Sequence, residues 1–196
     1  MAKFVTDIEV YNAALLRVGE SPVAQNDTSA EAAIYRGVHD SLVMDLLTRH
    51  KWSFARKVHR LIKQGESGNT PKYVYVLPND FLLAHRLTLC NRIIQDYEIR
   101  SGKLLADVDS AELDLHYTFK AAVRDWSADF TEGVVLKEMA VIKRALHDDT
   151  YEADKLDKKA EDHFLDALAR ARTSQGQGRA EPNSALIDRW RGAGRA

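Results

Sequence analysis

Apolar residues recur at every third or fourth position in two segments near the N-terminus, which is the spacing of a helix with one buried face. Just before the first segment, Thr6 and Glu9 have the spacing of a capping box, whose side chains accept hydrogen bonds from free backbone N–H groups. A second such box begins at Thr28. The pattern predicts one helix over about 6–19 and a longer one over about 28–50.

The hydrophobic period changes to two between residues 56 and 118. Alternation is clearest over 73–77 and 113–117, as expected for half-buried strands, and the Ser-Gly pair at 101–102 predicts a hairpin turn. We expect a β-rich insertion over about 56–118 that forms a small antiparallel sheet. The segment 64–71 contains two glycines and a proline, and is expected to be its most mobile loop.

Helical spacing returns after this insertion and predicts two further helices, over about 125–147 and 151–173. From residue 174 the chain loses periodicity and becomes rich in Ser, Gln, Gly and Pro, which indicates a flexible tail over 174–196. The predicted fold class is α+β and mainly α. It consists of a four-helix body with an inserted small antiparallel β-region, in a single domain over 1–173, followed by the flexible C-terminal tail.

The 196-residue chain is 45% hydrophobic and 29% charged, fractions that are typical of soluble globular proteins. No segment approaches the roughly 20 continuous apolar residues that cross a bilayer, so we expect no membrane role. The formal net charge of −1 disfavours tight nucleic-acid binding by the whole chain. The single cysteine, Cys90, lies in a strand-like run and is expected to be a buried apolar residue of a protein that folds in a reducing cytoplasm.

The tail differs in charge from the rest of the chain, because residues 170–196 hold six arginines against two acidic residues. A short segment within it combines aliphatic side chains, an indole and guanidinium groups, which are residue types that anchor protein interfaces. These candidate partner-binding residues are Leu186, Ile187, Arg189, Trp190 and Arg191. The alternative is a solvated terminus without a partner.

The sequence contains few features of an enzyme. Its seven histidines include no pair at the i, i+4 spacing of a helical zinc site, and no phosphate-binding loop or nucleophile elbow is present. We therefore expect no metal, cofactor or catalytic residue. The strongest enzyme alternative is a carboxylate-based peptidoglycan hydrolase, for which the candidate acids cluster at the ends of the third predicted helix: Asp125, Asp129, Glu132, Asp148 and Asp149.

The order of these parts resembles the head-tail adaptor proteins of short-tailed bacteriophages, the tail tubular protein A-like family, over about residues 5–173. In that family a proline usually precedes the motif tryptophan, where this chain has Lys51. The residues that carry the resemblance, individually ordinary core residues but specific in order and spacing, are Trp52, Phe54, Ala55, Tyr73, Tyr75, Leu77, Pro78, Asp80, Asp107, Leu113, Leu115, Tyr117 and Phe130.

The resemblance implies a structural virion protein and no enzymatic activity. About twelve copies would form a ring beneath the portal at the head-tail junction, where the ring extends the DNA channel and docks the tail nozzle. Its implied partners are further copies of itself, the portal protein and the tail nozzle, while DNA passes through the lumen without tight binding. A second alternative is a helical DNA-binding module whose basic tail follows the phosphates.

Overall fold

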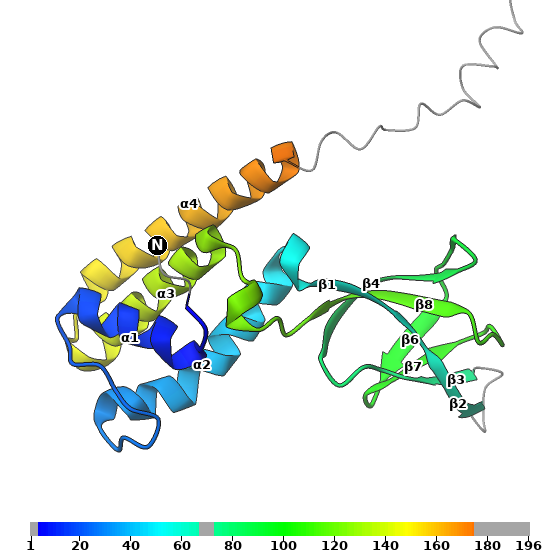
Figure 1. Cartoon of the computed structure of the whole chain (residues 1–196), viewed down its shortest axis with the longest axis horizontal. Helices are drawn as coiled ribbons and strands as arrows, with labels where there is room; N and C mark the ends of the chain where they lie inside the picture. Colours follow the sequence, from blue (N-terminus) through cyan, green and yellow to red (C-terminus); the bar gives the residue numbers. More distant parts are fainter. Residues whose placement is uncertain (1–3, 67–72, 175–196) are drawn as a thin grey trace, which may run out of the picture.

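The chain forms a helical unit and a β unit that lie side by side in the computed structural model, which describes residues 4–66 and 73–174 (Figure 1). The helical unit is built from both ends of the described chain, and the β unit is inserted between its second and third helices. The helices are α1 (Asp7–Val18), α2 (Ala30–Arg49), α3 (Ala128–Leu146) and α4 (Thr150–Ser174), with short 3-10 turns at η1 (Ser53–Ala55) and η2 (Val123–Asp125).

The four predicted helices are present, each with bounds within three residues of those expected. At the start of α1 the Glu9 carboxylate accepts a hydrogen bond from the backbone N–H of Thr6 at 3.2 Å, and Gly19 ends the helix at a φ of 90°. The cap predicted at Thr28 is wrong by one residue. Ser29 caps α2 instead, and its hydroxyl accepts a hydrogen bond from the N–H of Ala32 at 3.2 Å.

The β unit consists of two four-stranded antiparallel sheets. Sheet A has the strand order β1-β8-β4-β5 and sheet B the order β2-β3-β7-β6. The strands are β1 (Arg56–Arg60), β2 (Ile62–Glu66), β3 (Tyr73–Val76), β4 (Phe81–Leu89), β5 (Arg92–Ile94), β6 (Tyr97–Arg100), β7 (Lys103–Ala106) and β8 (Leu113–Phe119). The predicted hairpin joins β6 to β7, and both Ser101 and Gly102 have positive φ as a primed turn requires.

The chain passes from sheet A to sheet B at both pairs of edges. On one side β1 is followed directly by β2 through the buried Leu61, whose N–H donates to the carbonyl of Leu113 at 2.8 Å. On the other side β5 is followed by β6 after two residues. The two sheets are therefore connected at both pairs of edges and enclose one core.

The prediction of a mainly α fold with a small β insertion is wrong, because the structure is 48% helical and 25% strand and has a mixed α/β fold. The error came from strands that show no alternation. All five residues of β1 are exposed, and β5 has only three residues. Residues 64–66 of the predicted mobile loop belong to β2, while 67–72 of that loop and the tail over 175–196 lie outside the described residues.

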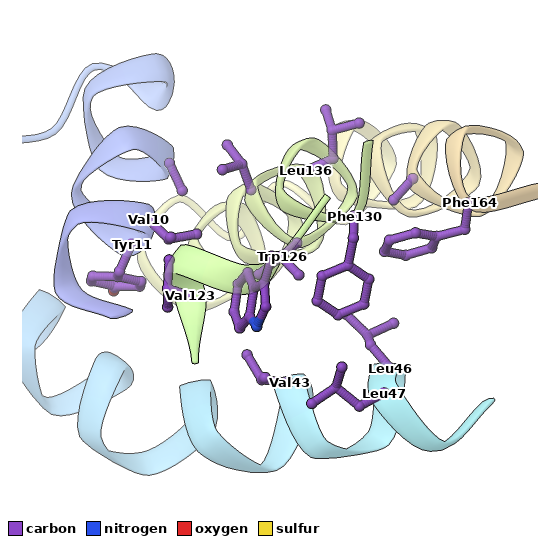
Figure 2. Close-up of a cluster of buried hydrophobic side chains, with 14 of the residues drawn as sticks. Val10, Tyr11, Val43, Leu46, Leu47, Val123, Trp126, Phe130, Leu136 and Phe164 are labelled. Carbon is purple, nitrogen blue, oxygen red and sulfur yellow. The ribbon is translucent and has the colours of Figure 1, made fainter. Parts of the chain in front are cut away.

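Each unit has its own hydrophobic core. In the helical unit, aromatic side chains from α3, α4 and the segments beside the turns pack with aliphatic residues of α1 and α2 (Figure 2). In the β unit the core is formed by Leu61, Tyr75, Leu77, Leu87, Leu104, Ala106, Leu113, Leu115 and Tyr117. Phe119 contacts both cores and lies where the two units meet.

The close packing of α3 on α4 depends on Gly133. A Cβ atom added at this position would lie 2.0 Å from Cε1 of Phe164, whose ring is buried against Trp52 and Phe130. Absence of a side chain at Gly133 therefore lets the Phe164 ring rest directly on the backbone of α3.

We expect Gly133→Ala to lower the free energy of unfolding by about 1 to 3 kcal/mol, because the added methyl group must displace a packed ring. Gly37→Ala in α2 is the matched control, since its Cβ would meet nothing within 4 Å. Better helix propensity should make that control more stable by up to about 1 kcal/mol. Urea denaturation followed by circular dichroism measures both, and equal stability changes would contradict the packing argument.

Candidate functional site

The aromatic motif after α2 anchors the end of that helix in the helical core. The indole N–H of Trp52 donates to the carbonyl of Leu46 at 2.9 Å, and the Trp52 ring centroid lies 5.0 Å from that of Phe130. Phe54 stacks beside Trp52 at 6.0 Å, and Ala55 is completely buried. These residues hold the point at which the chain leaves the helical unit.

The second motif segment lies in the β unit. Tyr75 is buried in β3, and its hydroxyl donates to the carbonyl of Val108 at 2.5 Å and accepts from the N–H of Ser110 at 3.2 Å. It therefore fixes the loop that follows β7. Tyr73 is half-buried with the ammonium group of Lys63 above its ring at 4.2 Å, while Leu77, Leu113 and Leu115 belong to the β core and Asp107 is exposed.

The motif residue Asp80 connects several segments where the two units meet. Its Oδ1 accepts a hydrogen bond from the hydroxyl of Tyr117 and its Oδ2 accepts one from the ammonium group of Lys57, both at 2.8 Å. The Lys57 ammonium group also lies 3.7 Å from the ring centroid of Phe119. We call Lys57, Asp80, Tyr117 and Phe119 the junction cluster. The half-buried Pro78 precedes it at the turn before β4, and its carbonyl accepts from the N–H of Phe81 at 3.1 Å.

The hydrogen bonds of the junction cluster shift the pKa values of its members. Partial burial opposes ionisation of Asp80, but the hydrogen bonds from Lys57 and Tyr117 outweigh burial and lower the pKa of the carboxyl group. Burial and the nearby carboxylate raise the pKa of the Tyr117 hydroxyl. Asp80 is therefore an ionised acceptor and Tyr117 a neutral donor at physiological pH.

The structure thus brings most of the predicted motif residues into the two cores and the junction between them. Trp52, Phe54, Ala55 and Phe130 lie in or against the helical core, and those from β3 and β8 lie in the β core. The five candidate partner-binding residues of the tail, Leu186 to Arg191, fall outside the described residues.

The candidate hydrolase acids form two groups at opposite ends of α3, and Glu132 and Asp129 are engaged in ion pairs. Asp148 and Asp149 follow the end of α3, whose 19 residues place them about 28 Å from the acids at its start. Glu132 receives two hydrogen bonds from Arg17, at 2.5 and 2.9 Å, and these lower the pKa of its carboxyl group, although a general acid needs a raised value. Asp129 accepts from Arg170 at 2.8 Å.

Cys90 is exposed, so the prediction that it is buried is wrong. It and Asn91 both have positive φ and form the tight turn between β4 and β5, which places the thiol at the surface, 3.4 Å from a carboxylate oxygen of Glu112. Among residues 4–66 and 73–174, no group of three His, Cys, Asp or Glu side chains could hold a metal ion. Within the same ranges, none of the helices combines the length and the apolar character that a membrane span requires.

Sequence reasoning missed a buried charge cluster formed by Asp7, His39 and Glu138. His39 and Glu138 are only 3% and 2% exposed, and the imidazole Nδ1 is hydrogen-bonded to Oε1 of Glu138. On the other side of the ring, Nε2 lies 3.3 Å from Oδ1 of Asp7, the first residue of α1. The cluster thereby links α1, α2 and α3. The one available sequence signal was a glutamate among the apolar residues of α3.

The second carboxylate oxygen of Glu138 is buried without a hydrogen-bond partner in the described part of the chain. Glu138 also lines a small cavity with room for about one water molecule. The cavity is lined by Tyr11, Ile34, Val38, His39, Leu42, Glu138 and Val141.

The buried charge cluster holds a proton that the unfolded chain releases. Burial disfavours the charged imidazole, but its contacts with Asp7 and Glu138 outweigh burial and raise the pKa of His39 to about 9. Burial also raises the pKa of Glu138, against the opposing effect of His39. Both shifts have the same sign, so the folded pair binds more protons than the unfolded pair above the ordinary pKa of histidine.

We expect the free energy of unfolding to fall as pH rises from about 6.5 to about 9. The contribution of His39 is complete below its unfolded pKa of about 6.5 and is lost as pH passes its folded value, at most about 3 kcal/mol in total. Urea denaturation across this range tests the expectation. Glu138→Gln should flatten the dependence, whereas Glu132→Gln on the same helix should leave it unchanged, and an identical slope in all three proteins would contradict the assignment.

A double-mutant cycle tests the junction cluster. Asp80→Ala and Tyr117→Phe should each destabilise the protein, with a coupling energy of roughly 0.5 to 1.5 kcal/mol, because they share one hydrogen bond. The control cycle pairs Asp80→Ala with Tyr75→Phe, whose hydroxyl bonds to Val108 and not to Asp80. That control pair should be additive, and additivity in both cycles would remove the proposed link.

No protein-family model fits the chain, and the search of curated proteins finds none with significant sequence similarity. The function must therefore be argued from the residues themselves.

Proposed function

We propose that this protein is a head-tail adaptor of a short-tailed bacteriophage. In this proposal about twelve copies form a ring beneath the portal at the head-tail junction of the virion. The ring extends the channel through which DNA enters and leaves the capsid, and it provides the surface on which the tail nozzle docks. The protein acts as a structural part and performs no bond-breaking.

The observation that carries the proposal is the order and spacing of the motif residues, which resemble those of the adaptor family. Their positions in the fold give this order a physical meaning. Trp52 anchors the chain after α2, Tyr75 holds the loop after β7, and Asp80 binds Tyr117 of β8. The motif residues therefore stabilise the two units separately, and Phe119, which packs against both cores, links the orientation of one unit to the other.

A fixed orientation is what a subunit of a closed ring requires. A head-to-tail ring closes only when every subunit adds the same rotation. If the connection between the two units were loose, the rotation from one subunit to the next would vary and the ring would not close. Such a ring also needs two different contact surfaces on each subunit, and units of different architecture lying side by side can supply them (Figure 1).

Assembly on a template explains how the ring can form from weak contacts. Each contact between neighbours need not persist in solution, because subunits bound side by side on a portal have a high effective concentration for one another. In this proposal the tail makes the portal contact, with Leu186, Ile187 and Trp190 entering a groove between portal subunits while Arg189 and Arg191 pair with carboxylates. The purified protein alone can then be monomeric.

The test is to mix the full-length protein with its cognate portal protein and examine the product by electron microscopy and native mass spectrometry. We expect a ring of about twelve adaptor copies on the portal, and a monomer or small oligomer without it. Deletion of residues 183–196 should leave a folded protein, by circular dichroism, that no longer binds the portal.

Two results would count against the proposal in different ways. Unchanged portal binding after the deletion would exclude the tail as the portal contact. Absence of any complex between the full-length protein and the portal, under conditions in which both are folded, would exclude the adaptor function.

A further inference from the structure

The outer face of sheet A, opposite the β core, carries an unusual set of polar side chains. Along β1 the outward residues Arg56, Val58 and Arg60 pair with Thr118, His116 and Asp114 of β8. On the other side of β8, Arg86 of β4 pairs with His116. His116 of β8 therefore lies between β1, which carries Arg56 and Arg60, and β4, which carries Arg86.

The two ends of this face differ in charge. At one end Arg60 is held by Asp114 through hydrogen bonds of 3.1 and 3.4 Å, so its charge is balanced locally. Lys51 and Arg56 at the other end, and Arg86 in the middle of the face, have no carboxylate partner among the residues that the structure describes. We call Lys51, Arg56, His85, Arg86 and His116 the cationic face.

The two histidines of the cationic face respond to this unbalanced charge. Partial burial and the charges of Lys51 and Arg56, with a smaller effect of His116, lower the pKa of His85. Burial and the charges of Arg86 and Arg56 lower the pKa of His116, against the opposing effect of Asp114. Both rings are therefore neutral near pH 7, and each can take up a proton when an anion approaches.

Hydrogen bonds hold both rings in place on the sheet. Nε2 of His85 lies 2.8 Å from the hydroxyl of Thr118, and Nε2 of His116 lies 3.2 Å from that of Thr88. Nδ1 of His116 is 3.5 Å from a guanidinium nitrogen of Arg86. The cationic groups are thus arranged on a regular backbone, with neighbouring strands about 5 Å apart.

The distribution of apolar residues argues against a protein partner for this surface. Protein interfaces usually have an apolar centre with a polar rim. Here His116 lies between Val58 and Arg86, Leu83 lies in the same row as Arg56, and Ile93 lies on the opposite edge strand, so the exposed aliphatic residues are interspersed with polar and charged ones and form no apolar centre. A face of this kind suits a ligand that presents closely spaced negative charges and little apolar surface.

We propose that the cationic face binds the phosphate backbone of double-stranded DNA, weakly and without sequence preference. Arg56, Arg86 and Lys51 contact phosphates directly, and His85 and His116 add positive charge by taking up protons when DNA binds. This inference goes beyond the proposed function, which requires DNA to pass without tight binding and needs no contact of this kind. It also differs from binding by the basic tail.

The experiment measures binding of the full-length protein to a labelled duplex of about 25 base pairs by fluorescence anisotropy, from about 20 to 150 mM salt. We expect Arg56→Glu combined with Arg86→Glu to weaken binding at least about tenfold at low salt and to reduce the salt slope by roughly 2. Both residues are exposed, so the variant should remain folded.

Two further variants separate this surface from the rest of the protein. Lys158→Glu combined with Lys159→Glu changes two exposed lysines of α4 and should leave binding within about twofold. His85→Gln combined with His116→Gln should remove the tighter binding expected at pH 6.0 relative to pH 7.5, while Arg189→Glu combined with Arg191→Glu in the tail should preserve that pH response.

Several outcomes would overturn the inference. One is the absence of binding at the lowest salt. Another is an equal loss of DNA affinity in the α4 control and in the Arg56 and Arg86 variant. A third is loss of binding in the tail variant alone. If poly-L-glutamate competes as well as DNA does, the surface recognises acidic protein chains and the nucleic-acid assignment is wrong. None of these results depends on whether the protein forms a ring on a portal, so the two proposals fail separately.

Discussion

The fold depends on a helical core that is completed by chain segments on both sides of the inserted β unit. Because the β unit is inserted between α2 and α3, the chain must exit and re-enter at neighbouring points. A tryptophan marks each point, and each indole donates to a backbone carbonyl five or six residues earlier: Trp52 to Leu46 and Trp126 to Ala121. Both rings contact Phe130 at 5.0 Å, so one buried phenylalanine joins the two crossings to α3.

This arrangement makes the two units energetically dependent on each other. The aromatic contacts that complete the helical core also determine where β1 begins and where β8 ends. Phe119 then packs against both cores, and Asp80 joins Lys57 to Tyr117 beside it. The side chain of Phe119, which belongs to the β unit, thereby helps to complete the helical core.

The sequence was most informative where local physics determines structure. Helix bounds followed from caps and from the 3.6-residue period, and the β6–β7 turn followed from a Ser-Gly pair. The extent of the sheets could not be predicted, because edge strands such as β1 expose every side chain and show no alternation. Cys90 was misplaced for a related reason, since a strand-like apolar run gives no sign of the tight turn at its end.

The buried charge cluster shows a different limit of sequence reasoning. Asp7, His39 and Glu138 are far apart in the chain and meet only after three helices pack. Periodicity indicates that Glu138 faces the core, but not which residue compensates its charge.

The uneven charge of sheet A likewise depends on tertiary structure. In the helical unit, cations such as Arg17 and Lys137 pair with carboxylates of neighbouring helices. A net charge of −1 for the whole chain therefore conceals an unbalanced positive surface on the β unit.

The exposed turn between β4 and β5 has a practical consequence. It carries the only thiol of the chain, at the surface of the β unit and separate from the junction. A single maleimide dye or spin label can be attached there without introducing or removing any cysteine. The natural sequence thus already contains one site at which a reporter for the position of the β unit can be attached.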